Sequence, residues 1–163
     1  MKTNITLIIA FLFLGLNTNF AQTSTVACNE NISYLQENTK AKKFTKALPF
    51  YRKARKDCPK YNPSAQFKYG EDIFEGLLEA ATTDAEKVEY INELCTLWDS
   101  RIVEYASKSP KGKYEAKKVE LRYDYRELLG LTDEQLFNEF DAIYKSDLEN
   151  FSNPKGLYVY FKM

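Results

Sequence analysis

The 163-residue sequence contains no histidine, which excludes Ser-His-Asp and Cys-His catalysis and most zinc and haem sites. Only six glycines are present, and none belongs to a Gly-rich loop that would cradle phosphate groups. Paired carboxylates could still serve a glycosidase, although acidic residues at helical spacing are far more often a solvated face. We therefore expect a protein that has no catalytic activity and needs neither a metal nor a cofactor.

Net charge and long hydrophobic runs are also missing from the sequence. Lys and Arg total 23 and so do Asp and Glu, so no overall field attracts nucleic acid or an anionic membrane. Beyond the N-terminus, no segment approaches the roughly 20 apolar residues of a membrane-spanning helix. We expect neither a nucleic-acid partner nor a transmembrane segment in the mature chain.

The N-terminus has the layout of a secretory signal peptide. Lys2 provides a basic start, the run from Ile5 to Leu16 is apolar, and Ala21 is a small residue suited to cleavage. This run is too short for an ordinary membrane anchor, although an uncleaved anchor remains the alternative. We predict a signal peptide over residues 1–21.

Cleavage there would leave residues 22–163 as one helical domain, exported to the periplasm or associated with the outer membrane. A lipoprotein modified at Cys28 is an alternative, but a polar stretch separates this cysteine from the apolar run.

The mature chain has the composition of packed helices, because aromatic residues are abundant while glycine and proline are scarce. Apolar residues recur three and four positions apart in successive segments, and no run reads convincingly as a strand. Six or seven helices are expected, over about residues 27–42, 44–58, 63–81, 84–107, 110–129, 133–151 and 155–163.

Helix-boundary signals support this division. Thr83 and Thr132 each open a capping box, in which the hydroxyl accepts from a backbone amide and a Glu or Gln side chain reaches back. Asn62 before Pro63 and Ser109 before Pro110 are predicted helix starts. Gly130 is a predicted stop, since it adopts a positive φ easily.

The clearest pattern lies between residues 43 and 59, where small alanines alternate with large aromatics on one apolar stripe. Ala47, Tyr51, Ala54 and Pro59 have the spacing of the second half of a tetratricopeptide repeat, so this stretch resembles that family. The first half matches less well, because Leu35 stands where the family has a small residue. An ordinary helical bundle with a fortuitous stripe is the alternative.

The resemblance implies an all-α fold of antiparallel helical hairpins, stacked as a short right-handed solenoid. It also implies a scaffold that binds a protein or peptide of a Gram-negative cell envelope, without catalysis. A surface glycan-binding helical protein is the alternative function. Transferred by register, the family's groove positions fall on Asn29, Gln36, Lys40 and Gln66. The segment over residues 155–163 either docks back on the other helices or leads into further repeats.

Three cysteines remain after cleavage, and their spacing matches no zinc site. Cys28 and Cys58 fall at the start of the first helix and the end of the second, which lie side by side in an antiparallel hairpin. Because exported proteins form disulfides, we expect these two to be bonded, with two separate thiols as the alternative. Cys95 lies on a strong apolar stripe and is expected to be a buried, inert thiol.

Charge is unevenly distributed along the chain. From Lys40 to Lys60 there are nine Lys or Arg and one acid, whereas from Glu71 to Glu104 there are ten acids and two bases. These blocks either offer complementary contacts to a partner or neutralise each other between neighbouring hairpins. The predicted basic patch consists of Lys42, Lys43, Lys46, Arg52, Lys53, Arg55 and Lys56.

Overall fold

The computed structural model describes residues 25–163, in which helices account for the regular structure and no strand occurs. The predicted all-α fold is therefore confirmed for this part of the chain, while the predicted signal peptide, residues 1–21, lies outside the described residues. The helices are residues 25–40, α2 (Phe44–Asp57), α3 (Pro63–Ala80), α4 (Asp84–Glu104), the 3-10 helix η1 (Ala106–Lys108), α5 (Lys111–Asp124), α6 (Arg126–Leu129), α7 (Asp133–Asp147) and α8 (Pro154–Lys162).

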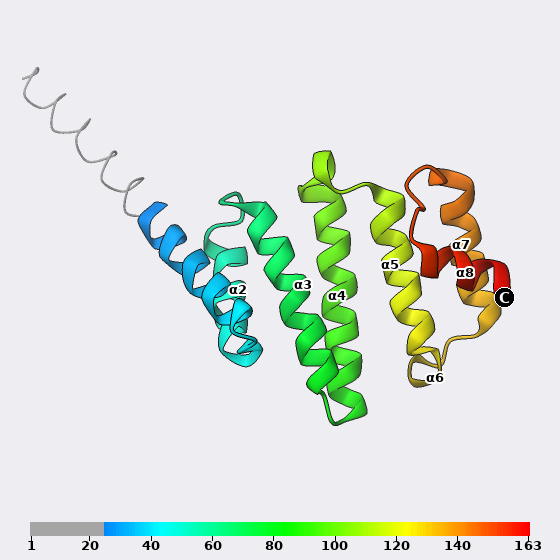
Figure 1. The fold of residues 1–163 in the computed structure, drawn as a ribbon, viewed down its shortest axis with the longest axis horizontal. Helices are drawn as coiled ribbons and strands as arrows, with labels where there is room; N and C mark the ends of the chain where they lie inside the picture. The colour runs from blue at the N-terminus through cyan, green and yellow to red at the C-terminus, as the bar shows by residue number, and fades with distance from the viewer. Residues whose placement is uncertain (1–24) are drawn as a thin grey trace, which may run out of the picture.

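The long helices stand side by side in chain order along the longest axis of the molecule (Figure 1). The most extensive packing is between α2 and α3, α3 and α4, α4 and α5, and α5 and α7. Helix 25–40 passes in front of α2 in this view, and α8 crosses in front of α7 and also packs on α5. None of the helices within residues 25–163 is long and apolar enough to cross a membrane.

Local capping explains where several helices begin. Thr83 accepts from the backbone N–H of Glu86 at 3.3 Å, and the Glu86 carboxylate accepts from the Thr83 N–H at 3.0 Å. Thr132 and Gln135 form the same reciprocal pair, and the Asn62 side chain accepts from the first turn of α3. These predicted starts are confirmed.

The start of α5 is built differently from the prediction. Ser109 does not cap this helix, because its hydroxyl accepts a hydrogen bond from Arg101 Nε at 3.3 Å. The carboxylate of Asp147, at the end of α7, instead accepts from the Gly112 N–H at 2.7 Å. A residue distant in sequence therefore satisfies the helix terminus and also ties α7 to α5.

Three predicted helix ends are also wrong. The fourth helix ends at Glu104 and continues as η1, the fifth is interrupted at Tyr125 before α6, and α7 ends at Asp147, ahead of Phe151. Gly130 does end α6, with φ of 66°.

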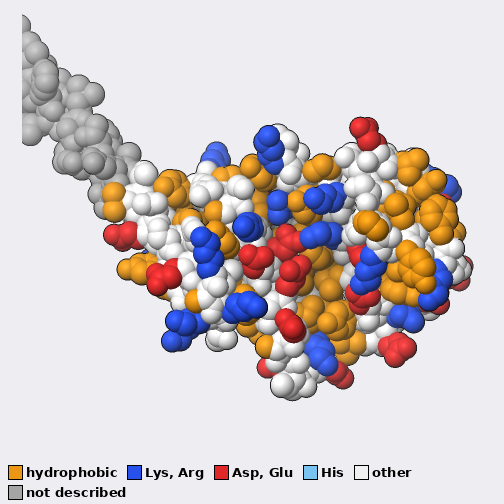
Figure 2. Space-filling model, viewed as in Figure 1, with side chains coloured by type: hydrophobic (Ala, Val, Ile, Leu, Met, Phe, Trp, Pro, Cys, Tyr) orange, Lys and Arg blue, Asp and Glu red, His pale blue; other side chains and the backbone are white. Residues whose placement is uncertain are grey.

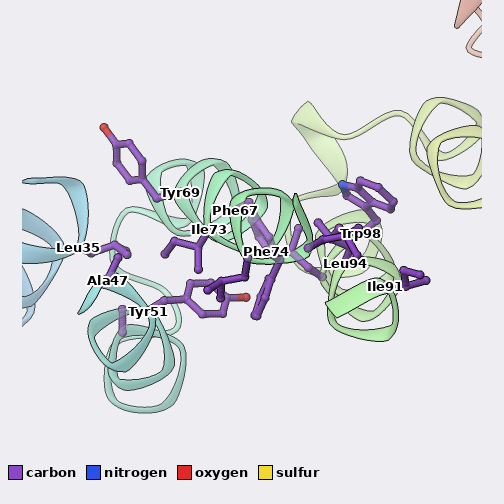
Figure 3. Close-up of a cluster of buried hydrophobic side chains, with 14 of the residues drawn as sticks. Leu35, Ala47, Tyr51, Phe67, Tyr69, Ile73, Phe74, Ile91, Leu94 and Trp98 are labelled. Carbon is purple, nitrogen blue, oxygen red and sulfur yellow. The ribbon is translucent and has the colours of Figure 1, made fainter. Parts of the chain in front are cut away.

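Two hydrophobic clusters form the core. The larger one extends from helix 25–40 to α5 and includes fully buried Phe67, Ile73 and Leu94 (Figure 3). The smaller one joins α5, α7 and α8. Because α5 contributes to both clusters, it links the two parts of the helical row.

Candidate functional site

Cys28 and Cys58 are joined by a disulfide with a Cα–Cα distance of 5.8 Å, as predicted, so the alternative of two separate thiols is wrong. The bond ties helix 25–40 to the residue that follows α2. It fits an exported chain, because disulfides persist in oxidising compartments. The Cys28 sulfur in this bond cannot also carry a lipid thioether.

The groove positions transferred from the tetratricopeptide family divide into two groups. Asn29 and Lys40 are exposed and Gln36 is half-buried, and their spacing places all three on one face of helix 25–40. Gln66 is fully buried, and its amide donates to the backbone carbonyls of Cys58 at 2.7 Å and Tyr61 at 2.6 Å. Gln66 therefore braces the turn beside the disulfide and does not contribute to a partner-binding surface.

The predicted basic patch is partly neutralised by the acidic helix α4. Arg55 donates from Nη2 to both carboxylate oxygens of Glu104, at 2.7 and 2.9 Å. Arg52 approaches Glu93 at 3.4 Å. The prediction that acidic and basic blocks neutralise each other between neighbouring hairpins is therefore confirmed for Arg52 and Arg55.

The lysines of the same patch behave differently from the arginines. All of them are exposed, and none forms an ion pair within the described chain. These unpaired lysines are Lys42, Lys43, Lys46, Lys53 and Lys56.

The most interconnected charged group lies where α3, α4 and α5 meet. Glu71 on α3 accepts from Arg101 of α4 at 3.4 Å and also from Lys117 of α5. The Glu71 and Arg101 side chains are only 13% and 15% exposed, so this is a largely buried bridge. The acidic cluster is visible in the sequence, but its partners are not, because Arg101 and Lys117 lie 30 and 46 residues from Glu71.

Aromatic rings hold the cations of this group in place. The Arg101 guanidinium lies 4.6 Å from the centre of the Tyr114 ring, and the Lys117 ammonium lies 5.5 Å from that of Trp98. Such cation–π contacts favour fixed positions for the charges. Glu71, Arg101 and Lys117 therefore form a structural brace that is not free to bind a partner.

Asp72 and Glu75, on the same stretch of α3, are different because neither forms an ion pair within residues 25–163. Desolvation by surrounding protein raises the pKa of both carboxyl groups. The Lys68 charge lowers the pKa of Asp72 and the Glu71 charge raises it, whereas the Glu71 charge raises the pKa of Glu75 and the Lys117 charge lowers it. Figure 2 shows acidic side chains gathered near the middle of this face, over α3, with Lys and Arg side chains around them. Asp72 and Glu75 therefore carry negative charge that no close ion pair within residues 25–163 neutralises, although the charges of Lys68 and Lys117 act on them.

Cys95 is half-buried, whereas the sequence predicted a buried thiol. It lines a pocket of about 340 Å³ together with Ile91, Asn92, Asp99, Lys118, Arg122, Leu129 and Leu131. The Lys118 ammonium is paired with Asp99 at 2.5 Å. Burial raises the pKa of the Cys95 thiol, which keeps it protonated and poorly nucleophilic.

Comparisons with protein-family models, with characterised proteins and with solved structures found no match to this chain. The resemblance to tetratricopeptide repeats therefore rests on the residue pattern around Ala47 and Tyr51 and stays a prediction.

Proposed function

We propose that the chain is an exported helical scaffold that binds a protein or peptide of the cell envelope and carries out no catalysis. Its helices are proposed to form tetratricopeptide-like hairpins, stacked as a short right-handed solenoid. Three features support the proposal: the packing of the helices in chain order, the Cys28–Cys58 disulfide and the alanine–aromatic stripe of α2. Periplasmic or outer-membrane location is part of the proposal.

The carboxylates of Asp72 and Glu75, which form no ion pair within residues 25–163, are the observation that carries this function. Asp72 is half-buried and Glu75 is exposed, and no Lys or Arg of the described chain forms an ion pair with either carboxylate. A lysine or arginine from a partner would form the close ion pair that these carboxylates lack within residues 25–163. We therefore propose that the partner presents a basic segment to this face.

Chemical crosslinking in cell-envelope preparations tests the proposal directly. The full chain and an Asp72→Asn/Glu75→Gln variant are compared for the partner that they recover. A matched control, Glu89→Gln/Glu149→Gln, removes the same charge from two exposed carboxylates that form no ion pair in residues 25–163. We expect one defined partner with the wild type and the control and about tenfold less with the α3 variant. Equal recovery by all three proteins would remove the α3 face from the proposal.

Surface glycan binding is the second candidate, because it requires exposed aromatic side chains. Three of these lie on α7 and α8, where Phe137, Tyr158 and Phe161 are 38%, 63% and 71% exposed. Glycan-array binding without recovery of a protein partner would favour this function over the scaffold.

A further inference from the structure

Helix α8 has one buried face and one exposed apolar face. The buried face carries Gly156 and Val159. The Gly156 backbone lies against the Phe151 ring, and the Val159 side chain is 3% exposed and belongs to the smaller core cluster. On the other side Tyr158 and Phe161 are 63% and 71% exposed. Two large apolar side chains one helical turn apart form a continuous surface on a single helix.

Neighbouring aromatic rings support this surface. Phe161 packs edge-on against Tyr144 of α7 with ring centres 5.9 Å apart, and it lies 5.0 Å from Tyr160. The Phe161 ring is therefore held in position while most of its area stays in water. Figure 2 shows hydrophobic side chains exposed together over the end of the molecule where α7 and α8 lie.

The packing of the other helices indicates what would cover this face. Each of α3, α4 and α5 packs against the long helix before it and the long helix after it. Within the described residues α8 packs mainly on α5 and α7, and Phe161 adds an edge-on ring contact with Tyr144 of α7. A helix laid on Tyr158 and Phe161 would add one more helix-on-helix interface of the kind that joins the other helices.

The charges that border the face specify the partner further. The Lys162 ammonium lies 5.7 Å from the centre of the Tyr158 ring and has no acidic partner within residues 25–163. Lys155, at the other end of α8, is paired with Asp124 at 2.5 Å. A second copy of α8 would bring lysines against lysines, which is unfavourable. Acidic side chains on the partner would instead complement Lys162.

We propose that the outer face of α8 is a docking site for an amphipathic helix whose apolar stripe is flanked by Asp or Glu. Tyr158 and Phe161 would enter that stripe, and Lys162 would pair with its acidic flank. This surface is separate from the acidic face of α3. It does not depend on the proposed scaffold function.

Fluorescence anisotropy with three labelled helical peptides tests the proposal on the full chain. The peptides share one leucine–alanine stripe and differ only in having Glu, Gln or Lys beside it. We expect the Glu peptide to bind at least about tenfold more tightly than the Lys peptide, with a difference that shrinks as salt is added. Phe161→Ser should weaken binding of the Glu peptide about tenfold. Val103→Ser is the control, because Val103 is 80% exposed on α4, away from this face.

Three results would overturn the proposal. The first is equal affinity of the wild type and Phe161→Ser for the Glu peptide. The second is concentration-dependent self-association that Phe161→Ser abolishes and the Glu peptide does not, which would make a second copy the occupant. The third is binding on a glycan array that Tyr158→Ser abolishes while all three peptides fail to bind. Variants at Asp72 and Glu75 should leave peptide binding unchanged, so failure here is distinct from failure of the scaffold proposal.

Discussion

Cys28 and Cys58 are bonded across 30 residues of sequence, and the bond joins helix 25–40 to the end of α2. Helix 25–40 brings few large side chains to the core, with Ile32 and Leu35 the buried aliphatic ones. The Gln66 amide holds the Cys58 carbonyl at 2.7 Å and so fixes the α3 side of the same junction. Covalent and hydrogen-bonded constraints thus compensate for a helix with a small apolar face.

Replacing both cysteines, as Cys28→Ser/Cys58→Ser, should lower the free energy of unfolding by about 3 kcal/mol. The reason is that the unfolded chain loses a cross-link closing a loop of 30 residues. Urea unfolding followed by circular dichroism measures the change. Cys95→Ala is the control and should cost less than about 1.5 kcal/mol, because Cys95 is only half-buried and unbonded. Equal losses in the two proteins would show that the disulfide adds no stability.

Gly70 on α3 permits close approach of α2 and α4. A Cβ at this position would lie 2.5 Å from the Tyr51 ring and 2.6 Å from a Leu97 methyl group. Gly70→Ala should therefore destabilise the fold by about 1–3 kcal/mol, because two buried side chains have to move. Thermal unfolding measures this loss, and Gly130→Asn is the matched control. Gly130 has φ of 66° and open space around it, and asparagine tolerates that conformation, so the control should keep its midpoint.

Local features of this fold could be read from the sequence because they depend on residues a few positions apart. The hydroxyls of Thr83 and Thr132 reach amides three residues away, and Gly130 adopts its positive φ without help from distant groups. The disulfide was also predictable, since antiparallel pairing of two consecutive helices places their distant ends together.

Features that depend on distant neighbours could not be predicted. Gln66 was placed in a groove by a repeat register, but the turn after Cys58 leaves two carbonyls that its amide satisfies inside the protein. The α5 terminus takes its cap from Asp147, which lies 35 residues away from Gly112. The sequence of the basic stretch does not show that Arg55 pairs with Glu104 of α4 while the neighbouring lysines stay in solvent. The way α2 packs on the other helices determines which side chains can reach α4.

The ion pairs of Glu71, which is largely buried, should contribute more to stability than the ion pair of the exposed Asp99. Glu71→Gln would leave Arg101 and Lys117 without their shared carboxylate in a setting where Glu71 is 13% exposed, so we expect a loss of about 3 kcal/mol. Asp99→Asn removes the partner of Lys118, but Asp99 is 57% exposed and the loss should stay below about 1 kcal/mol. Urea unfolding of both variants gives the comparison. Losses of the same size would mean that solvent screens the Glu71 bridge as fully as the Asp99 pair.

Glu75 and Glu86 should affect stability with opposite dependence on pH. Desolvation, and then the Glu71 charge, raises the pKa of Glu75, so the folded state binds its proton more tightly than the unfolded state does. The ionised carboxylate therefore disfavours folding, and this effect grows as the pH rises above the ordinary glutamate pKa of about 4.3. Hydrogen bonds from Thr83 and Thr82 lower the pKa of Glu86, so its charge stabilises the fold at neutral pH and ceases to do so as the pH falls through the lowered pKa.

Thermal unfolding midpoints of Glu75→Gln and Glu86→Ala, measured from neutral to acidic pH, test these signs. At neutral pH, Glu75→Gln should unfold at or above the wild-type temperature, and Glu86→Ala should unfold below it. The advantage of Glu75→Gln should vanish in acid, because the wild-type carboxyl is then protonated as well. The deficit of Glu86→Ala should shrink in acid, since protonated Glu86 no longer accepts the hydrogen bonds of the capping box. A Glu75→Gln midpoint below that of the wild type at neutral pH would mean that attraction to Lys117 outweighs desolvation and the Glu71 charge, and Glu75 would then have no unsatisfied charge to offer a partner.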